Sequence, residues 1–271
     1  MRFREPDMTL WCGEDASDRD YLREVATLVY DTYTGRGRRW QLPASSPFWE
    51  ISFGNRSGVF GARLNDRVSC VKLFYDERLR TKLRTMAGLS KGYWAYRNGL
   101  RLNRLGVGCP RMWGCIQQRP LGPTMIVTEL IEDGLRLDHW VLENGTPRAA
   151  VLKLAQFVRG MHDKGVTHTD LSPRNILIRP RPGHYEFLLL DYEDARFRRC
   201  VSRRQRLKDL HHLHERLFHH AALRARLWFL KAYTEQDYRP YRDALARMMK
   251  DQPPHRHPGV PPQVKRPGPA Q

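Results

Sequence analysis

The spacing of hydrophobic residues divides the chain into a first part rich in strands, where they alternate with polar residues, and a mainly helical second part, where they recur every three or four residues. Over residues 48–75, apolar and polar positions alternate between glycines and turn residues, which is typical of antiparallel strands. Two further apolar runs, 111–117 and 124–131, flank the proline-rich turn 118–123 and predict two more strands. A last pair of short apolar strands surrounds the turn from Pro180 to Gly183.

Apolar positions three and four residues apart predict helices before, between and after these strands. One helix follows a capping-box pattern at Ser17 and continues to Val29. A second covers 89–105, and a third covers 146–164; each is followed by a glycine suited to a left-handed helix end. A leucine stripe over 207–230 predicts that the rest of the chain is mainly helical.

The order of these elements predicts an α+β fold with two lobes. Residues 1–50 form an N-terminal extension with an amphipathic helix, and 51–130 form a small antiparallel β lobe with one main helix. Residues 131–251 form a larger, mostly helical lobe. The segment 252–271 holds seven of the eighteen prolines without periodicity, so we expect a disordered tail.

Composition excludes several classes of protein. The chain of 271 residues carries neither a secretory signal pattern nor an apolar run of about 18 residues, so we expect it in the cytoplasm. Its five cysteines are dispersed and never form a C-x-x-C pair, which argues against a disulfide framework or a zinc site. Histidines crowd between His211 and His220, and their spacing predicts a polar helix face rather than a metal site.

The formal net charge of +18 favours polyanionic partners such as nucleic acid, an anionic membrane or a phosphorylated substrate. Residues 63–111 contain twelve Lys or Arg and three acids, so they hold half of the excess charge. A solvated basic face without a partner is the alternative.

Polar residues that could take part in catalysis are concentrated in the stretch VTHTDLSPRNILI, residues 166–178. His168, Asp170 and Asn175 lie there, between a predicted helix and a strand pair, and Asp191 directly follows the second strand. Phosphoryl transfer depends on aligning a hydroxyl and neutralising phosphate charge, which carboxylate and amide side chains on a rigid loop can do. The alternative is a polar turn in which these side chains satisfy backbone groups.

The segment HTDLSPRN resembles the catalytic loop of protein-kinase-like enzymes, and LLLDYE stands where those enzymes carry the metal-binding Asp-Phe-Gly. The resemblance implies a protein-kinase-like fold and the use of ATP and Mg2+. It implies that Asp170 accepts or orients the acceptor hydroxyl and that Asn175 and Asp191 bind Mg2+. It also implies that His168 holds the loop by hydrogen bonds.

The small lobe of such enzymes supplies groups that bind the nucleotide. Lys72, within SCVKLFY, is the candidate for the phosphates, and an exposed strand lysine is the alternative. Gly54 and Gly58 lie where a phosphate-cradling loop is expected, although the middle glycine of G-x-G-x-x-G is absent and an ordinary hairpin turn is the alternative. Glu129, before the linker between the lobes, is a further nucleotide-binding candidate.

Three positions depart from the kinase pattern. No acidic residue lies between Arg78 and Thr128, so the helix glutamate that pairs with the strand lysine is missing, displaced or supplied elsewhere. Glu193 replaces the glycine of Asp-Phe-Gly. Thr169 replaces the arginine that docks a phosphorylated activation loop, which argues against that form of regulation.

Within this superfamily, the chain resembles the bacterial lipopolysaccharide-core sugar kinases, on the loop HTDLSPRNIL, the segment DYE and the arginine-rich YRNGLRLNRLGVGCPRMWG. The resemblance spans about residues 52–232. It implies an ATP-dependent kinase acting on a heptose or Kdo hydroxyl of the inner core. Its acceptor would be an anionic glycolipid, reached by peripheral contact of the basic segment with the cytoplasmic face of the inner membrane. Nucleic acid is disfavoured, because the aromatic residues fall at core-like spacing.

Two other functions stay open at the level of sequence. One is a kinase acting on protein or on another small molecule, such as an aminoglycoside, although pockets for cationic drugs tend to be acidic. The other is a non-catalytic, kinase-shaped binding protein, which the missing helix glutamate supports.

Overall fold

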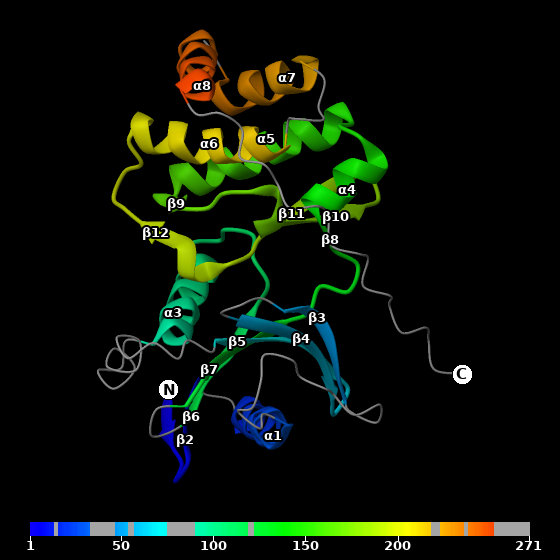
Figure 1. Cartoon of the computed structure of the whole chain (residues 1–271), viewed down its shortest axis with the longest axis vertical. Coiled ribbons are helices and arrows are strands. Elements are labelled where there is room, and N and C mark those ends of the chain that lie inside the picture. Colours follow the sequence, from blue (N-terminus) through cyan, green and yellow to red (C-terminus); the bar gives the residue numbers. More distant parts are fainter. Residues whose placement is uncertain are drawn as a thin grey trace.

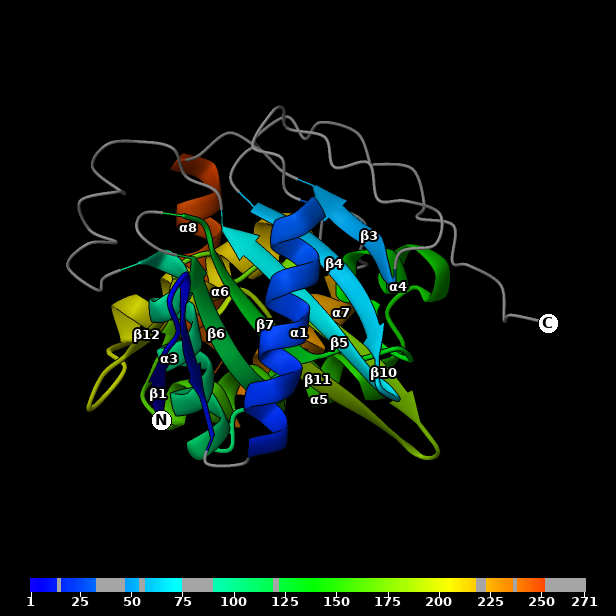
Figure 2. The same ribbon diagram turned by 90° about the horizontal axis from the view of Figure 1, so that it is seen from below.

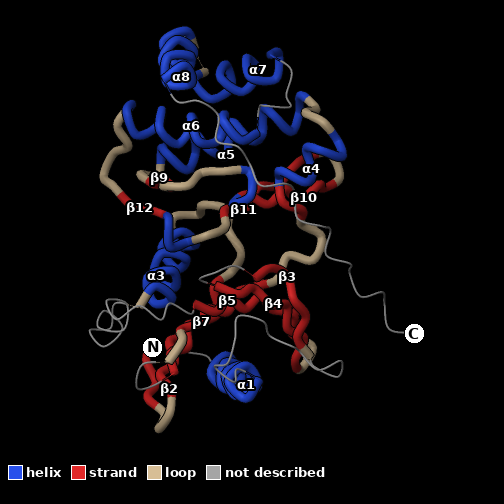
Figure 3. The backbone as a smooth tube through the Cα atoms, viewed as in Figure 1, coloured by secondary structure: helices blue, strands red, loops and turns tan. Residues whose placement is uncertain are grey.

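The computed structural model describes residues 1–13, 16–32, 47–53, 57–74, 90–118, 122–217, 223–235 and 238–251. These residues form two lobes, a sheet-rich one in the lower half of Figure 1 and a mostly helical one above it. Figure 3 shows the same division, with strands dominating the lower lobe and helices the upper one. The predicted α+β, bilobal fold is confirmed.

The small lobe is built on an antiparallel sheet whose described strands follow the order β1-β2-β6-β7-β5-β4-β3. These strands are β1 (Arg2–Arg4), β2 (Met8–Cys12), β3 (Phe48–Phe53), β4 (Ser57–Leu64), β5 (Arg67–Phe74), β6 (Met112–Gln118) and β7 (Thr124–Glu129). Strands β3 to β7 occupy the runs that the alternating pattern predicts. Strands β1 and β2 were not predicted; β2 pairs with β6, so the N-terminal extension lengthens the sheet of the small lobe.

Two helices cover opposite faces of this sheet. Helix α1 (Ala16–Thr32), the amphipathic helix predicted for the extension, packs against β2, β4 and β6 and shares a core with Met125 and Val127 of β7. Figure 2 shows α1 lying across the sheet. The residue between those two, Ile126, belongs to the core on the side of α3 (Lys91–Arg104), because neighbouring strand residues point to opposite faces. Ser90 caps α3 by accepting from the Tyr93 backbone N–H at 3.2 Å.

The large lobe places short strand pairs beneath a group of helices. It comprises β8 (Leu135–Arg136), α4 (Leu137–Asn144), α5 (Arg148–Asp163), β9 (Val166–His168), η1 (Pro173–Asn175), β10 (Ile176–Arg181), β11 (His184–Leu189), η2 (Tyr192–Asp194), β12 (Ala195–Phe197), α6 (Arg203–Leu217), α7 (Leu223–Thr234) and α8 (Arg239–Asp251). Strand β10 pairs with β8 and β11, and β9 pairs with β12. The apolar face of α5 and the apolar residues of β9 and β10 share one core with α6 and α7.

Two predicted glycine stops are confirmed by their backbone angles. Gly106 after α3 has φ +63°, and Gly165 after α5 has φ +77°, the left-handed region that favours glycine. Gly165 has a second reason to be glycine, since a Cβ there would lie 2.1 Å from the Arg198 carbonyl oxygen. This close approach brings β9 and β12 together next to the loop 169–175.

Some expectations fall outside the described residues. Gly54 and the proline-rich segment 252–271 are among them. None of the helices that the structure describes is long and apolar enough to span a bilayer.

Candidate active site

Lys72 and Asp191 meet between the two lobes, although 119 residues separate them in sequence. Val71 and Leu73 of β5 face α1, so Lys72 points to the other face of the sheet, toward the large lobe. Its Nζ donates to Asp191 Oδ1 at 2.6 Å. The Asp191 side chain stays 39% exposed, while that of Lys72 is 15% exposed. The Lys72 ammonium is therefore held inside the site, and Asp191 lies at the part of the site that solvent can reach.

Glu193 supplies the carboxylate that α3 lacks. Its Oε1 accepts from Lys72 Nζ at 2.9 Å, and its side chain is only 8% exposed. Lys91, in the first turn of α3, approaches the same oxygen at 3.4 Å. Burial disfavours the charge of Lys72, but the negative charges of Asp191 and Glu193 outweigh this effect and raise its pKa above the ordinary value. Lys72 is thus a permanently charged ammonium.

The loop from His168 to Asn175 is held by its own polar side chains. His168 is fully buried, and its Nε2 donates to the Asp191 carbonyl at 3.0 Å. Asn175 Nδ2 donates to the Asp170 carbonyl at 2.9 Å and lies 3.3 Å from its Oδ2. The Leu190 backbone N–H donates to the Asn175 carbonyl at 2.8 Å. These bonds bring Asp170, Asn175 and Asp191 to one place.

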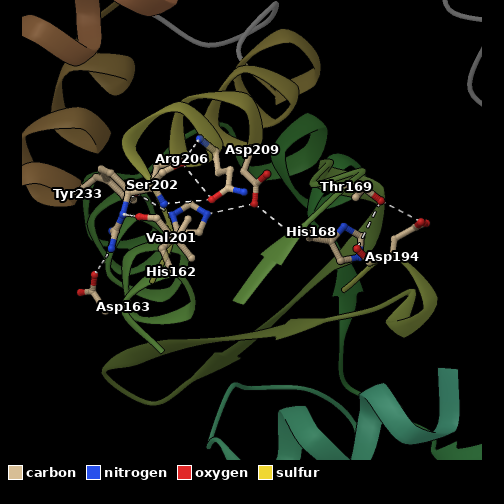
Figure 4. A network of polar contacts seen from close by, with 11 residues as sticks. His162, Asp163, His168, Thr169, Asp194, Val201, Ser202, Arg206, Asp209 and Tyr233 are labelled. Carbon is tan, nitrogen blue, oxygen red and sulfur yellow. Dashed lines mark hydrogen bonds and ion pairs between the residues drawn. The ribbon is translucent and has the colours of Figure 1, made fainter. Parts of the chain in front are cut away.

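Asp209 of α6 holds this loop through hydrogen bonds (Figure 4). Its Oδ2 accepts from the His168 backbone N–H at 2.9 Å and from His162 Nε2 at 3.2 Å. With Nε2 donating, His162 Nδ1 is free to accept from the Tyr233 hydroxyl at 2.7 Å. Tyr233 in turn accepts from Arg206 at 3.3 Å. A buried chain of hydrogen bonds therefore connects α5, α6 and α7 to the loop.

Helix α3 is tied to the segment that carries Asp191. Asn98 Nδ2 donates to the carbonyls of Tyr192, at 2.8 Å, and Ala195, at 3.3 Å. The Tyr192 side chain is also buried, so core packing and the Asn98 hydrogen bonds together fix this segment. Asp191 itself adopts φ 55° and ψ 59°, a left-handed conformation uncommon for a residue with a side chain.

Comparison with known proteins shows the family to which the chain belongs. The family model described as "Lipopolysaccharide kinase (Kdo/WaaP) family" matches residues 96–241, more than half of the chain. The chain belongs to the Kdo/WaaP family.

This Kdo/WaaP-family chain is similar to a curated relative and, in fold, to a solved structure. The relative, 3-deoxy-D-manno-octulosonic acid kinase of Pasteurella multocida (strain Pm70), is 26% identical over 141 residues, 51% of this chain and 56% of the relative. The chain therefore spans only a little more than half of that relative's length. A structure of WaaP in complex with acyl carrier protein matches with TM-score 0.62 and 19% identity, over 89% of this chain and 97% of that chain. This second likeness concerns the fold.

Other predicted positions of this Kdo/WaaP-family site lie around the central group. Gly58 is at the start of β4, opposite Leu73 of β5, next to the lysine strand. Glu129 ends β7 at the linker to the large lobe, and its Oε2 accepts weakly from the Arg111 backbone N–H at 3.4 Å. Thr169 donates to Asp194 Oδ1 at 3.0 Å, so it contacts the segment after Asp191.

Sequence reasoning missed two residues of this family member that hold the predicted site residues in place. Glu193 appeared only as a departure from Asp-Phe-Gly, and its pairing with Lys72 links residues 121 positions apart. Asp209 carries a weaker signal, a buried acid in the otherwise basic start of α6. The expected polar face of histidines is wrong for His211 and His214, which are both buried.

Proposed function

We propose that this chain is an ATP- and Mg2+-dependent kinase that phosphorylates a sugar hydroxyl, of heptose or Kdo, in the lipopolysaccharide inner core. The observation that carries the proposal is the meeting of Lys72 and Asp191 at 2.6 Å beside the loop of Asp170 and Asn175. A lysine from one lobe and a loop-borne aspartate from the other are the groups that phosphoryl transfer from ATP requires at one point.

The residues on the small-lobe side suit the phosphates of ATP. The charged Lys72 would bind phosphate oxygens, and Glu193 would keep its ammonium in place when Asp191 turns to another ligand. Gly54 and Gly58 would let the backbone approach the phosphates, and Glu129 lies where the linker would meet the base.

The donor set on the large-lobe side fits Mg2+. A carboxylate oxygen of Asp191 and the amide oxygen of Asn175 are hard oxygen ligands of the kind Mg2+ prefers. Bound there, Mg2+ would neutralise charge that develops on the transferred phosphate. The amide nitrogen of Asn175 already donates to Asp170, so the orientation that serves the loop leaves the amide oxygen for a cation.

Asp170 would act on the acceptor. Its side chain is partly exposed, and the Asn175 amide and the chain of bonds through His168 to Asp209 fix its backbone. A carboxylate held in this way can accept or orient the proton of an attacking hydroxyl. Asp170 is therefore the proposed catalytic residue, and His168 and Asp209 are positioning residues.

The acceptor class follows from family membership and charge. The curated relative is named as a Kdo kinase, and the Kdo/WaaP family is described by its lipopolysaccharide substrate. The net charge of +18 suits an anionic glycolipid at the cytoplasmic face of the inner membrane. The non-catalytic alternative loses its main support, because Glu193 pairs with Lys72 in place of a helix glutamate.

The test is phosphate transfer from γ-labelled ATP with Mg2+ to a panel of acceptors. The panel holds a Kdo-terminated lipid A precursor, a heptose-bearing core oligosaccharide, a generic protein substrate and an aminoglycoside. We expect label on one of the two core sugars. Label only on the protein or the aminoglycoside, or no label with any acceptor, would contradict the proposal.

A further inference from the structure

Three large apolar residues are exposed on the small lobe, at or near α3. In the described part of the chain as a whole, the exposed large apolar residues are Met1, Trp94, Leu105, Leu142 and Leu223. Trp94 lies on α3, Leu105 directly follows it, and Met1 lies across a groove from it. Trp94 is 46% exposed and Met1 63% exposed. Isolated exposed hydrophobic residues are ordinary, but three around one helix indicate a surface with a partner.

The same side of α3 is basic. Lys91, Arg97, Arg101 and Arg104 are exposed, and with Trp94 they recur every three or four residues along one helix face. The 14 residues of α3 contain no acid. Within the described residues, no carboxylate forms an ion pair with any of the three arginines. Arg97 instead lies over the Trp94 ring, 5.7 Å from its centroid.

A groove of about 560 Å³ lies beside this helix, and Met1, together with Trp11 of β2, forms its other side. Its walls combine aromatic and aliphatic groups, such as Trp11, Tyr93 and Leu100, with the guanidinium groups of the three arginines. Arg2 adds a further cation, 5.5 Å from the Trp11 ring. The groove beside α3 is therefore lined by apolar side chains and bordered by positively charged ones.

We infer that this α3 face, defined by Lys91, Trp94, Arg97, Arg101 and Arg104, docks the protein on an anionic phospholipid bilayer. Arginine and lysine are attracted to anionic headgroups, and tryptophan and leucine insert at the boundary between headgroups and acyl chains. The inference rests on the proposed function, because an acceptor glycolipid would be presented in such a bilayer.

The position of α3 connects docking to the site. Asn98, a buried residue of the same helix, donates to the carbonyls of Tyr192 and Ala195 beside Asp191. Lys91, at the start of the same helix, contacts Glu193. Figure 1 shows α3 at the edge of the molecule, below the large lobe, with its outer side free of other described elements. One helix thus carries the docking face and also contacts the Asp191 segment.

Flotation with vesicles tests the docking face without acceptor or ATP. Vesicles of phosphatidylcholine with one third phosphatidylglycerol should bind the chain, and vesicles of phosphatidylcholine alone should bind it far less. The double variant Arg97→Gln, Arg104→Gln should partition about 30-fold more weakly, since each basic residue near such a surface contributes about 1 kcal/mol. Arg101 is left unchanged because it also packs over Phe197.

The matched control removes two equally exposed charges elsewhere, Arg204→Gln and Lys208→Gln on α6. This control should bind the anionic vesicles like the parent chain. Trp94→Ser should weaken binding while leaving the preference for anionic lipid. Equal losses in both double variants, or equal binding to neutral and anionic vesicles, would overturn the inference. A failed kinase proposal would be seen separately, as absent transfer to a soluble core oligosaccharide.

Discussion

Lys72 Nζ donates to Glu193 Oε1 at 2.9 Å, so the lysine of the small lobe takes its second carboxylate from the segment after Asp191 and not from α3. The two partners of Lys72 differ in burial, with Asp191 at 39% and Glu193 at 8% exposed. The exposed one is free to exchange its ammonium for a cation. The buried one keeps the lysine aligned, and its segment is in turn tied to α3 by the Asn98 hydrogen bonds.

Glu193→Gln tests this alignment. The change keeps the shape and one acceptor but removes the charge, and charged hydrogen bonds contribute about 1.5–3 kcal/mol, so kcat/KM for ATP should fall about 10- to 100-fold. Lys91→Ala is the control, because Lys91 is half exposed and its ion pair with Glu193 is weak. Steady-state kinetics with varied ATP should show less than about a five-fold change for that control. Similar losses in both variants would contradict a special role for Glu193.

Asp209→Ala should misplace the catalytic loop from a distance. It removes the acceptor shared by the His168 backbone N–H and His162, leaving two buried donors, each at a cost of about 1–3 kcal/mol. We expect kcat to fall with little change in KM for ATP, because Lys72 and Glu193 are untouched. A fall in thermal stability with full kcat at low temperature would instead show a merely structural residue.

Gly165→Ala should destabilise the large lobe more than Gly183→Ala does. Both glycines have nearly equal φ angles, +77° and +76°, so each substitution brings a similar left-handed strain of about 1–2 kcal/mol. Only at Gly165 does the new Cβ meet a backbone atom, the Arg198 carbonyl oxygen at 2.1 Å. Urea unfolding of both variants gives the difference. Equal losses would mean that β9 and β12 can separate without penalty.

The buried His214 makes stability depend on pH. Burial, with the nearby charges of Arg226 and His211, lowers the pKa of His214 to about 3. The unfolded chain binds a proton near pH 6.5 that the folded chain does not, so the free energy of unfolding should fall as pH drops below about 6.5. The contribution is about 1.4 kcal/mol per pH unit. His214→Leu should remove this part of the slope in urea unfolding between about pH 6.5 and 5, and an unchanged slope would contradict it.

Most of the fold followed from local patterns. Strands β3 to β7 and helices α1, α3 and α5 rest on periodicity, and the stops at Gly106 and Gly165 rest on backbone conformation, all readable from neighbouring residues. Strands β1 and β2 could not be predicted because they are short. Strand β2 pairs with β6, more than 100 positions away, and β1 pairs with β2.

The candidate site likewise has a part that local sequence predicts and a part that depends on tertiary packing. The spacing of His168, Asp170 and Asn175 is local, so the loop could be predicted. The partners of Lys72 and of His168 could not, because Glu193 and Asp209 reach them only through the packing of the lobes. The histidines of α6 were misjudged for a related reason, since the spacing of polar residues does not tell which face of a helix a neighbouring helix covers.

The most direct measurement of the central claim is the mass of a Kdo- or heptose-bearing core acceptor after incubation with the chain, ATP and Mg2+. We expect a product heavier by one phosphate group, located on the sugar. We also expect that Asp170→Asn forms that product about 10²- to 10⁴-fold more slowly, the usual range for loss of a proton-accepting side chain. An unmodified acceptor, or equal rates for the parent chain and Asp170→Asn, would contradict that claim.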